Sequence, residues 1–360
     1  MRTSALVPAL APAVALAATA VLGLGGTAQA APGGIVGHVY EPTNAAAGNA
    51  VAVFDRYADG SLEPAGSVAT GGLGAGASLA SQGAITRDGD LLFVVNAGDD
   101  SVSALSTDGG LARTDTIATG GDRPVSVTVR NGIGFVLNHD SDTVTGFTYS
   151  RSGDLTPVPG ATRALTPKAG GGLTDAAQLQ LSPDGRTLVV TERSGTIDTF
   201  DVRGGRLGDA TSHPSAGAVP YGFDFDRRGT LVVSEASGSA SSYRLAAGFR
   251  DVTEALVDTQ AAACWLVVSG DYAWVVNAAS ASVSTYRIAH DGSLTLVDAV
   301  AATTGAGPTD AAVSPDGGSL HVRMRDGSVS SFAIGAGGTL TSLGSAFEAT
   351  TFGVAGLVAD

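Results

Sequence analysis

The stretch Phe93-Val-Val-Asn-Ala-Gly-Asp-Asp-Ser-Val-Ser-Ala-Leu105 decides the fold, because the chain repeats its pattern. An apolar strand ends at Asn96, a short polar loop turns the chain, and Val102 opens the next strand six residues later. The same frame returns five times, with its turn residues at Asn138, Thr191, Ser234, Asn277 and Arg323. Intervals of 42, 53, 43, 43 and 46 residues separate the six turns. A period in the forties, built from strands and turns, is typical of the blades of a β-propeller.

Hairpin signals give the number of blades. Six repeats follow an Asp-Gly, Asn-Gly or similar turn, which favours the positive φ angles of tight hairpins. A second hairpin occurs seven times, first at Asp59-Gly60 and last at Gly337-Gly338. The first blade begins at Val36 and lacks an inner strand, which residues 352–359 can supply. We therefore predict an all-β fold, a seven-bladed β-propeller of four-stranded antiparallel blades, closed in the first blade by the C-terminal strand.

Residues 1–30 have the pattern of a secretory signal peptide. Arg2 precedes an apolar run from about residue 5 to residue 24, and Ala28-Gln29-Ala30 matches a cleavage signature. We predict cleavage near Ala30, secretion to the extracellular space, and a single propeller domain at residues 31–360. No later segment resembles a membrane anchor, so we expect no membrane insertion after cleavage.

Charge and composition restrict the partners. Without Arg2 the chain has 19 basic and 34 acidic residues, a formal charge of −15. This acidity argues against nucleic acid and anionic membranes as partners. We expect a monomer that binds a small-molecule lactone, a glycan or a cell-surface protein. Cys264 is the single cysteine, and the histidines show no metal-ligand spacing, so we predict no disulfide, no cofactor and no metal site.

One face of a propeller collects the starts of the inner strands and the ends of the second strands, and its loops usually bind ligands. Counting back from each hairpin predicts a ring at the strand starts. This predicted ring consists of Gln82, Val125, Gln178, Gly222, Trp265 and Asp310. The ends of the second strands add the six turn residues Asn96, Asn138, Thr191, Ser234, Asn277 and Arg323. The residues that follow them include His139, Glu192, Arg193, Glu235 and Arg325.

Each of these residue types also has a purely structural interpretation. Asn at a strand end caps a turn through its own side chain. Glu192 and Glu235 are either catalytic groups or paired and solvated carboxylates. Tyr221 and Trp265 either stack on a sugar ring or pack in the core and rim.

Three strings resemble a known family: Leu181-Ser-Pro-Asp-Gly-Arg-Thr-Leu-Val-Val190, Phe93-Val-Val-Asn96 and residues 305–317. They are similar to the seven-bladed lactonases, which include propeller-type 6-phosphogluconolactonases and carboxymuconate cyclases. The resemblance covers nearly all of the predicted mature chain and implies a seven-bladed fold and lactone hydrolysis. Members tend to carry Gly-x-x-Pro-Arg-His at the start of an inner strand, where this chain has Gly305-Ala-Gly-Pro-Thr-Asp310. The Arg and the His are missing, whereas the carboxylate after a strand is kept as Glu192.

Three functions are compatible with these residues. A secreted lactonase acting on a sugar-derived lactone would use Glu192 or Glu235 as the base, near Asp310. Its oxyanion donors would come from Arg193, Arg323, Gln82 and Gln178. Because the predicted ring holds no cation, a phosphorylated substrate is not expected. A non-catalytic extracellular propeller would bind a protein or glycan through the same polar mouth, which the missing Arg-His pair favours. A metal-dependent lactonase would hold an ion with Asn96, Asn138, Asn277, Glu192 and Asp310.

Overall fold

The computed structural model describes residues 33–246, 248–305, 307–347 and 355–360. The chain divides into two units, residues 1–31 and residues 32–360, and the fold below is that of the second. The predicted signal peptide and its cleavage site lie outside the described residues, as do residues 352–354 of the predicted closing strand. The described part of the chain contains no helix with the length and apolar character that a bilayer crossing requires.

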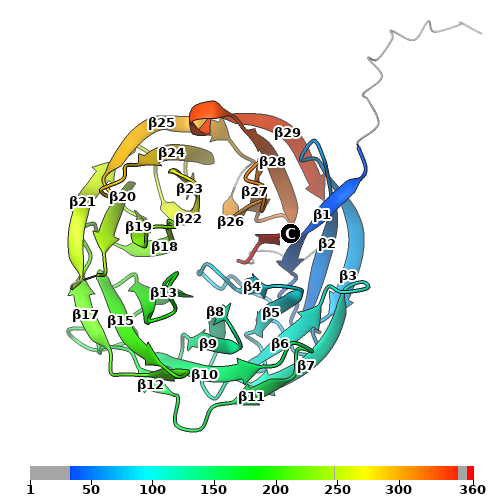
Figure 1. The fold of residues 1–360 in the computed structure, drawn as a ribbon, viewed down its shortest axis with the longest axis vertical. Coiled ribbons are helices and arrows are strands. Elements are labelled where there is room, and N and C mark those ends of the chain that lie inside the picture. Colours follow the sequence, from blue (N-terminus) through cyan, green and yellow to red (C-terminus); the bar gives the residue numbers. More distant parts are fainter. Residues whose placement is uncertain (1–32, 247, 306, 348–354) are drawn as a thin grey trace, which may run out of the picture. The chain divides into compact units, whose positions relative to one another are not determined.

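Seven antiparallel sheets form a ring, and each sheet is one blade (Figure 1). In each blade below, the inner strand is named first. Blade 1 contains β30 (Val358–Ala359), β1 (Ile35–Pro42), β2 (Ala50–Tyr57) and β3 (Leu62–Ala69). Blade 2 contains β4 (Ile85–Asp88), β5 (Leu91–Asn96), β6 (Ser101–Ser106) and β7 (Ala112–Ala118). Blade 3 contains β8 (Pro124–Arg130), β9 (Ile133–Asn138), β10 (Thr143–Tyr149), β11 (Leu155–Pro157) and β12 (Arg163–Ala164).

The remaining blades repeat this order. Blade 4 contains β13 (Ala176–Leu181), β14 (Thr187–Glu192), β15 (Thr196–Arg203), β16 (Arg206–Leu207) and β17 (Thr211–Pro214). Blade 5 contains β18 (Pro220–Phe225), β19 (Thr230–Glu235), β20 (Ser239–Arg244) and β21 (Arg250–Val257). Blade 6 contains β22 (Ala263–Ser269), β23 (Tyr272–Asn277), β24 (Ser282–Ile288) and β25 (Leu294–Thr303). Blade 7 contains β26 (Pro308–Val313), β27 (Ser319–Met324), β28 (Ser328–Ile334) and β29 (Leu340–Phe347).

The predicted seven-bladed fold and its closure are confirmed. β30 pairs antiparallel with β1, matching Val39 with Ala359 and Tyr40 with Val358. Asp360 fixes the junction, because its carboxylate accepts a hydrogen bond from the Tyr40 hydroxyl at 2.9 Å. Its backbone oxygen accepts a second from the Arg56 guanidinium at 2.7 Å. The first blade therefore takes its inner strand from the other end of the chain.

The core lies between neighbouring blades and is built mainly from the second strands. Every residue of β5 and of β19 is buried, whereas the outer strand β3 has no fully buried residue. A strand covered on both faces reads as a continuous apolar run, and one with a solvated face does not. This explains why segments such as Phe93-Val-Val repeat so clearly. The second strands are the regular part of each blade, and they place the loops of the candidate site.

Candidate functional site

Each inner strand from blade 2 to blade 7 follows a residue in the left-handed conformation. These residues are Ala80, Arg123, Asp175, Val219, Ala262 and Gly307, with φ angles of 51°, 54°, 56°, 69°, 57° and 73°. Non-glycine residues rarely adopt a positive φ angle, so a positive φ angle before six inner strands shows that the blades share one turn geometry. In blades 3 to 7 the pairing between the inner strand and the second strand shifts by a residue or more just after this turn, which is a β-bulge.

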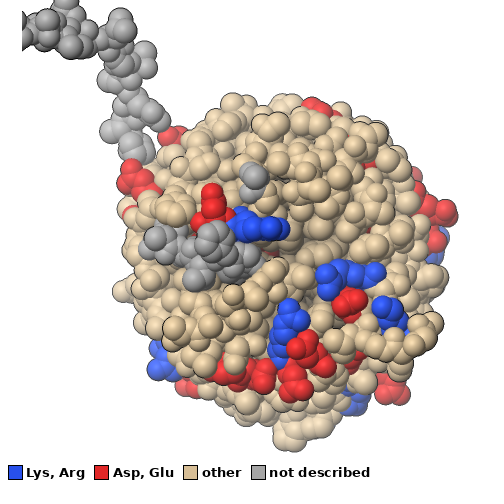
Figure 2. Space-filling model, turned by 180° about the vertical axis from the view of Figure 1, so that it is seen from behind, with Lys and Arg blue, Asp and Glu red and all other residues tan. Residues whose placement is uncertain are grey.

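A second residue contacts five of these turns. In blades 3 to 7 the residue that follows the second strand donates its backbone N–H to the carbonyl oxygen of the left-handed residue in the same blade. We call these the mouth pairs: His139 with Arg123 (2.9 Å), Arg193 with Asp175 (3.2 Å), Ala236 with Val219 (2.8 Å), Ala278 with Ala262 (2.7 Å) and Arg325 with Gly307 (2.8 Å). Together they surround the central hollow on the face where the inner strands begin, which Figure 2 shows.

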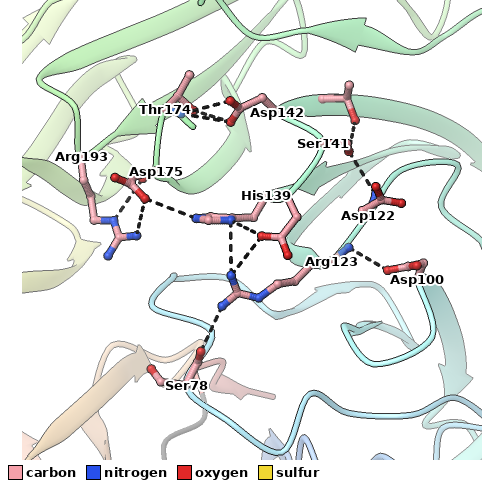
Figure 3. Close-up of polar contacts among 12 residues, drawn as sticks. Ser78, Asp100, Asp122, Arg123, His139, Ser141, Asp142, Thr174, Asp175 and Arg193 are labelled. Carbon is pink, nitrogen blue, oxygen red and sulfur yellow. Dashed lines mark hydrogen bonds and ion pairs between the residues drawn. The ribbon is translucent and has the colours of Figure 1, made fainter. Parts of the chain in front are cut away.

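The mouth pairs of blades 3 and 4 form a polar cluster (Figure 3). The His139 imidazole is 6% exposed and lies between two carboxylates. Its Nδ1 is 2.7 Å from Oδ1 of Asp140, and its Nε2 is 3.8 Å from Oδ1 of Asp175. Partial burial raises the pKa of Asp140, but hydrogen bonds from His139 and Arg123 outweigh it and hold that pKa below its ordinary value. Asp140 is therefore ionised and accepts the Nδ1 proton of His139.

Two guanidinium groups border the imidazole. NH1 of Arg123 is 3.2 Å from Oδ1 of Asp140, and its NH2 donates to the backbone oxygen of Ser78. Nε of Arg193 donates to the backbone oxygen of Asp175 at 3.1 Å, and its NH2 is 3.5 Å from the Asp175 carboxylate. The Arg193 guanidinium also lies 5.9 Å above the ring of Tyr221. The cluster thus combines an imidazole, two carboxylates and two cations from neighbouring blades.

The predicted ring contains no cation, but Arg123 lies two residues before its member Val125 and adds a cation that the ring did not include. An arginine and a histidine do meet here, although they come from different strands. Sequence reasoning also missed Asp175, which the left-handed turn holds at the mouth. Pro124 is the signal that could have found Arg123. Proline is tolerated at the first residue of a strand, so it marks where the inner strand starts and shows that Arg123 stands in the turn before it.

The predicted ring lies deeper than the mouth. The side-chain amide of Gln82 pairs with the backbone of Leu266 across the axis, at 2.7 and 3.1 Å. Gln178 pairs in the same way with Phe223, at 2.9 and 2.7 Å. Both glutamines also line a cavity of about 470 Å³ in the central channel. Their amides connect blades to one another, so the geometry does not offer them as oxyanion donors.

Tyr221 and Trp265 form the floor of the mouth. The two rings meet edge to face at 5.6 Å, and both are buried. The indole Nε1 of Trp265 donates to the backbone oxygen of Ser81 on the opposite side of the axis, at 2.9 Å. Both aromatics belong to a core cluster that also packs against Ala236 and Ala262. The structure therefore places them in the packing role that the sequence left open beside sugar stacking.

The register explains the two glutamates. Glu192 and Glu235 end their second strands and occupy the position of Asn96, because the following loops are one residue shorter. The turn residues Thr191 and Ser234 accordingly lie one position before that end. The prediction counted a fixed number of residues back from the next strand, so it could not detect that these two loops are one residue shorter.

Glu192, Glu235 and Asp310 are buried inside the fold. Burial raises the pKa of Glu192 to about 8, and the neighbouring Asp198 carboxylate adds to the shift against a hydrogen bond from Thr196. Burial also raises the pKa of Glu235 to about 7. It does the same for Asp310, whose carboxylate accepts the backbone N–H of Gly356 at 2.6 Å. None of the three carboxyl groups is presented to the mouth, because each side chain is buried.

The remaining predicted ligands are also internal. Asn138 and Asn277 donate to hydroxyl groups of their own blades, at 3.1 Å to Thr145 and 2.9 Å to Ser284. Nε of Arg323 forms a fully buried ion pair with Glu41, at 2.7 Å. These side chains hold turns and blades together, and Arg323 does not border the mouth. Among the described residues, no group of three or more His, Cys, Asp or Glu side chains is arranged to hold a metal ion.

Asn96 provides a test of the structural role. Its Oδ1 accepts hydrogen bonds from Asn49 at 2.9 Å and Thr70 at 2.7 Å, and its Nδ2 donates to Ser103 at 2.8 Å. Asn96→Ala removes one hydrogen-bond partner from each of these three buried groups, so we expect a loss of about 2 kcal/mol in the free energy of unfolding, measured in urea. A loss in ligand affinity at unchanged stability would instead restore Asn96 as a binding residue.

Comparison with known proteins identifies similar chains. The profile of a family described as "Lactonase, 7-bladed beta-propeller" matches residues 48–254. No curated protein matches the sequence. A Bacteroides uniformis protein provisionally named as a 6-phosphogluconolactonase aligns with a TM-score of 0.73 and 17% identity, over 90% of this chain and 99% of its own. A Bacteroides fragilis protein of the same provisional name gives 0.69 and 19%, over 90% and 98%. The periplasmic gluconolactonase of Pseudomonas aeruginosa gives 0.65 and 18%, over 89% and 98%.

Proposed function

Because the chain belongs to the lactonase family of seven-bladed β-propellers, we propose that it hydrolyses a lactone at the mouth, with His139 as the general base. The observation that carries this proposal is the imidazole held between Asp140 and Asp175 beside two arginines. This assignment replaces Glu192, whose carboxyl group lies inside blade 4. It keeps Arg193, which sequence reasoning had already selected.

The imidazole is oriented for base catalysis. Asp140 accepts a hydrogen bond from Nδ1–H of His139, so the lone pair of the imidazole is on Nε2, toward Asp175. A water molecule that contacts both Nε2 and the Asp175 carboxylate can lose a proton to Nε2 while its oxygen attacks the lactone carbonyl carbon. The C–O bond of the ring then breaks, and the imidazolium returns the proton to the leaving alkoxide. The product is the open hydroxy acid.

Arg193 supplies the charge stabilisation. Its Nε and NH2 contact Asp175, which leaves NH1 without a hydrogen-bond partner among the described residues. A guanidinium beside the scissile carbonyl stabilises the negative charge that develops on the carbonyl oxygen. Asp175 and Asp140 in turn stabilise the imidazolium. Arg193, Asp175 and Asp140 thus each have a role in the hydrolytic cycle, and Arg123 holds Asp140 in place.

We also propose that the mature protein is a secreted monomer that works outside the cell. The support is the pattern of residues 1–30, in which Arg2, an apolar run and Ala28-Gln29-Ala30 follow one another. Mass spectrometry of the exported protein would test the predicted N-terminus near Ala31.

His139→Gln tests the catalytic role. We expect the variant to lose at least about 100-fold in kcat/KM, because positioned general bases typically contribute that much or more. Proton release is measured on glucono-, galactono- and homoserine-type lactones, with and without EDTA. The matched control is His290→Gln, an exposed histidine in the hairpin after β24, which should keep full activity. Glutamine retains a donor toward Asp140, and circular dichroism verifies the fold.

Three outcomes separate the alternatives. Activity lost in Glu192→Gln but kept in His139→Gln would return the base to the buried carboxyl. Activity lost only with EDTA would indicate a metal-dependent lactonase. No turnover of any lactone by folded, monodisperse protein would leave a non-catalytic propeller that binds a protein or glycan.

A further inference from the structure

The mouth pairs of blades 3 to 6 divide into a polar half and an apolar half, and the fifth pair, in blade 7, adds Arg325 and Gly307 beyond the apolar half. Blades 3 and 4 contribute Arg123, His139, Asp175 and Arg193, which all carry polar groups. Blades 5 and 6 contribute only the apolar side chains of Val219, Ala236, Ala262 and Ala278. Figure 2 shows most charged residues gathered on one side of the hollow and a smaller charged group on another side, with a broad uncharged surface beside them. The left-handed turns have similar φ angles in all these blades, so the two halves differ only in their side chains.

The apolar half continues below the surface. Ala236, Ala262 and Ala278 pack against a core cluster that contains Tyr221 and Trp265. The Arg193 guanidinium lies over the ring of Tyr221 and connects this half to the polar cluster. A molecule bound beside His139 therefore extends naturally over alanine and valine surfaces that rest on this buried aromatic cluster.

Val219 is the most unusual residue of the apolar half. It has a φ angle of 69°, and its side chain is 37% exposed. A β-branched residue at positive φ is a conformational outlier, whereas Asn and Gly adopt this region readily. Strained residues of this kind concentrate at functional sites. An exposed valine here gains nothing for the fold, but it offers apolar surface to a ligand.

We propose that the substrate is a lactone carrying an apolar acyl chain, with the ring over blades 3 and 4 and the chain over blades 5 and 6. This inference rests on the proposed hydrolysis and names its substrate class. A polyhydroxylated sugar lactone of the same size would place hydroxyl groups against apolar side chains that cannot bond them, which costs affinity. An acyl chain instead removes apolar surface from water on both molecules.

Chain length tests the proposal directly. We expect kcat/KM to rise about two- to fourfold per methylene from N-acetyl- to N-octanoyl-homoserine lactone, as burial of a methylene predicts. Glucono-lactone should be the poorer substrate. In Val219→Asn and Ala262→Asn the octanoyl-to-acetyl ratio should fall at least tenfold. Asparagine suits a positive φ angle, so the exposed Val219→Asn should fold at least as stably as the parent protein. Ala262 packs against the core cluster, so urea unfolding verifies the fold of Ala262→Asn.

The matched control is Ala281→Asn. Ala281 lies in the same blade as Ala262 and also has a positive φ angle, 51°, but its backbone oxygen accepts from Thr304, just after the outer strand, and it belongs to no mouth pair. Its chain-length ratio should equal that of the parent protein. Calorimetry with N-acetyl- and N-octanoyl-homoserine lactam, which share the shape but resist hydrolysis, measures binding independently of turnover.

The outcomes distinguish the two proposals. Turnover that is independent of chain length, or that favours glucono-lactone, overturns the acyl-chain inference and leaves lactone hydrolysis standing. Chain-dependent binding of the lactams without turnover of any lactone supports the apolar half and overturns hydrolysis. Ratios that stay unchanged in both Val219→Asn and Ala262→Asn also overturn the inference, because those side chains are then not where the chain lies.

Discussion

Arg323→Met destabilises the protein by about 3–5 kcal/mol, the usual cost of removing one partner of a buried ion pair. Nε of Arg323 lies 2.7 Å from Oε2 of Glu41, and both side chains are fully excluded from solvent. NH1 of Arg323 also donates to Thr309 at 3.3 Å. Without the guanidinium, the buried Glu41 carboxylate must either remain charged away from solvent or take up a proton. Because Glu41 belongs to blade 1 and Arg323 to blade 7, the loss weakens the junction between the first and last blades.

Urea unfolding measures the loss of stability in Arg323→Met, and two further variants show whether the ion pair causes it. Glu41→Gln/Arg323→Met removes both charges, so the double variant should recover part of the stability that the single variant loses. Arg325→Met is the matched control, since this arginine is exposed and should change the free energy of unfolding by less than about 0.5 kcal/mol. A loss below about 1 kcal/mol in Arg323→Met would show that the ion pair contributes little to closing the ring.

Stability should fall as the pH rises from about 5 to about 9. Burial raises the pKa of Glu192 to about 8, and those of Glu235 and Asp310 to about 7, all well above ordinary carboxyl values. In this pH range the unfolded chain has already lost these protons, whereas the folded protein still holds them. Unfolding therefore releases protons, and higher pH favours it. The total is on the order of several kcal/mol, since one pKa unit corresponds to about 1.4 kcal/mol.

Glu192→Gln isolates the largest of these contributions. The amide cannot ionise, so the variant should lose less stability between pH 5 and pH 9 and should be more stable than the parent protein at pH 9. Glu254→Gln, at an exposed position of β21, should leave the pH dependence unchanged. Chemical unfolding at a series of pH values gives the comparison. Equal slopes for Glu192→Gln and the parent protein would mean that the Glu192 carboxyl is ionised in the fold.

The repeat made the architecture predictable, because the second strands are buried on both faces and must be apolar in every blade. Closure was predictable for a related reason, since seven outer hairpins faced only six inner ones. The candidate site was not. His139 and Asp175 lie in different blades, and their proximity depends on a left-handed turn followed by a bulge. Counting residues back from each hairpin detects neither the turn nor the bulge. It therefore selected residues such as Gln82 and Gln178, which lie two or three residues after the left-handed turn, inside the channel.

Pairing of β30 with β1 also governs when the fold can be completed. The hydroxyl of Tyr40 and the carboxylate of Asp360 are 320 residues apart in sequence, yet they bond directly. Contacts of such separation form slowly, because a long loop must close before they contribute any stability. A ribosome delivers the chain from its N-terminus, so blade 1 stays one strand short until β30 has been made. The earliest segment of the propeller to be made is thus the last to be finished.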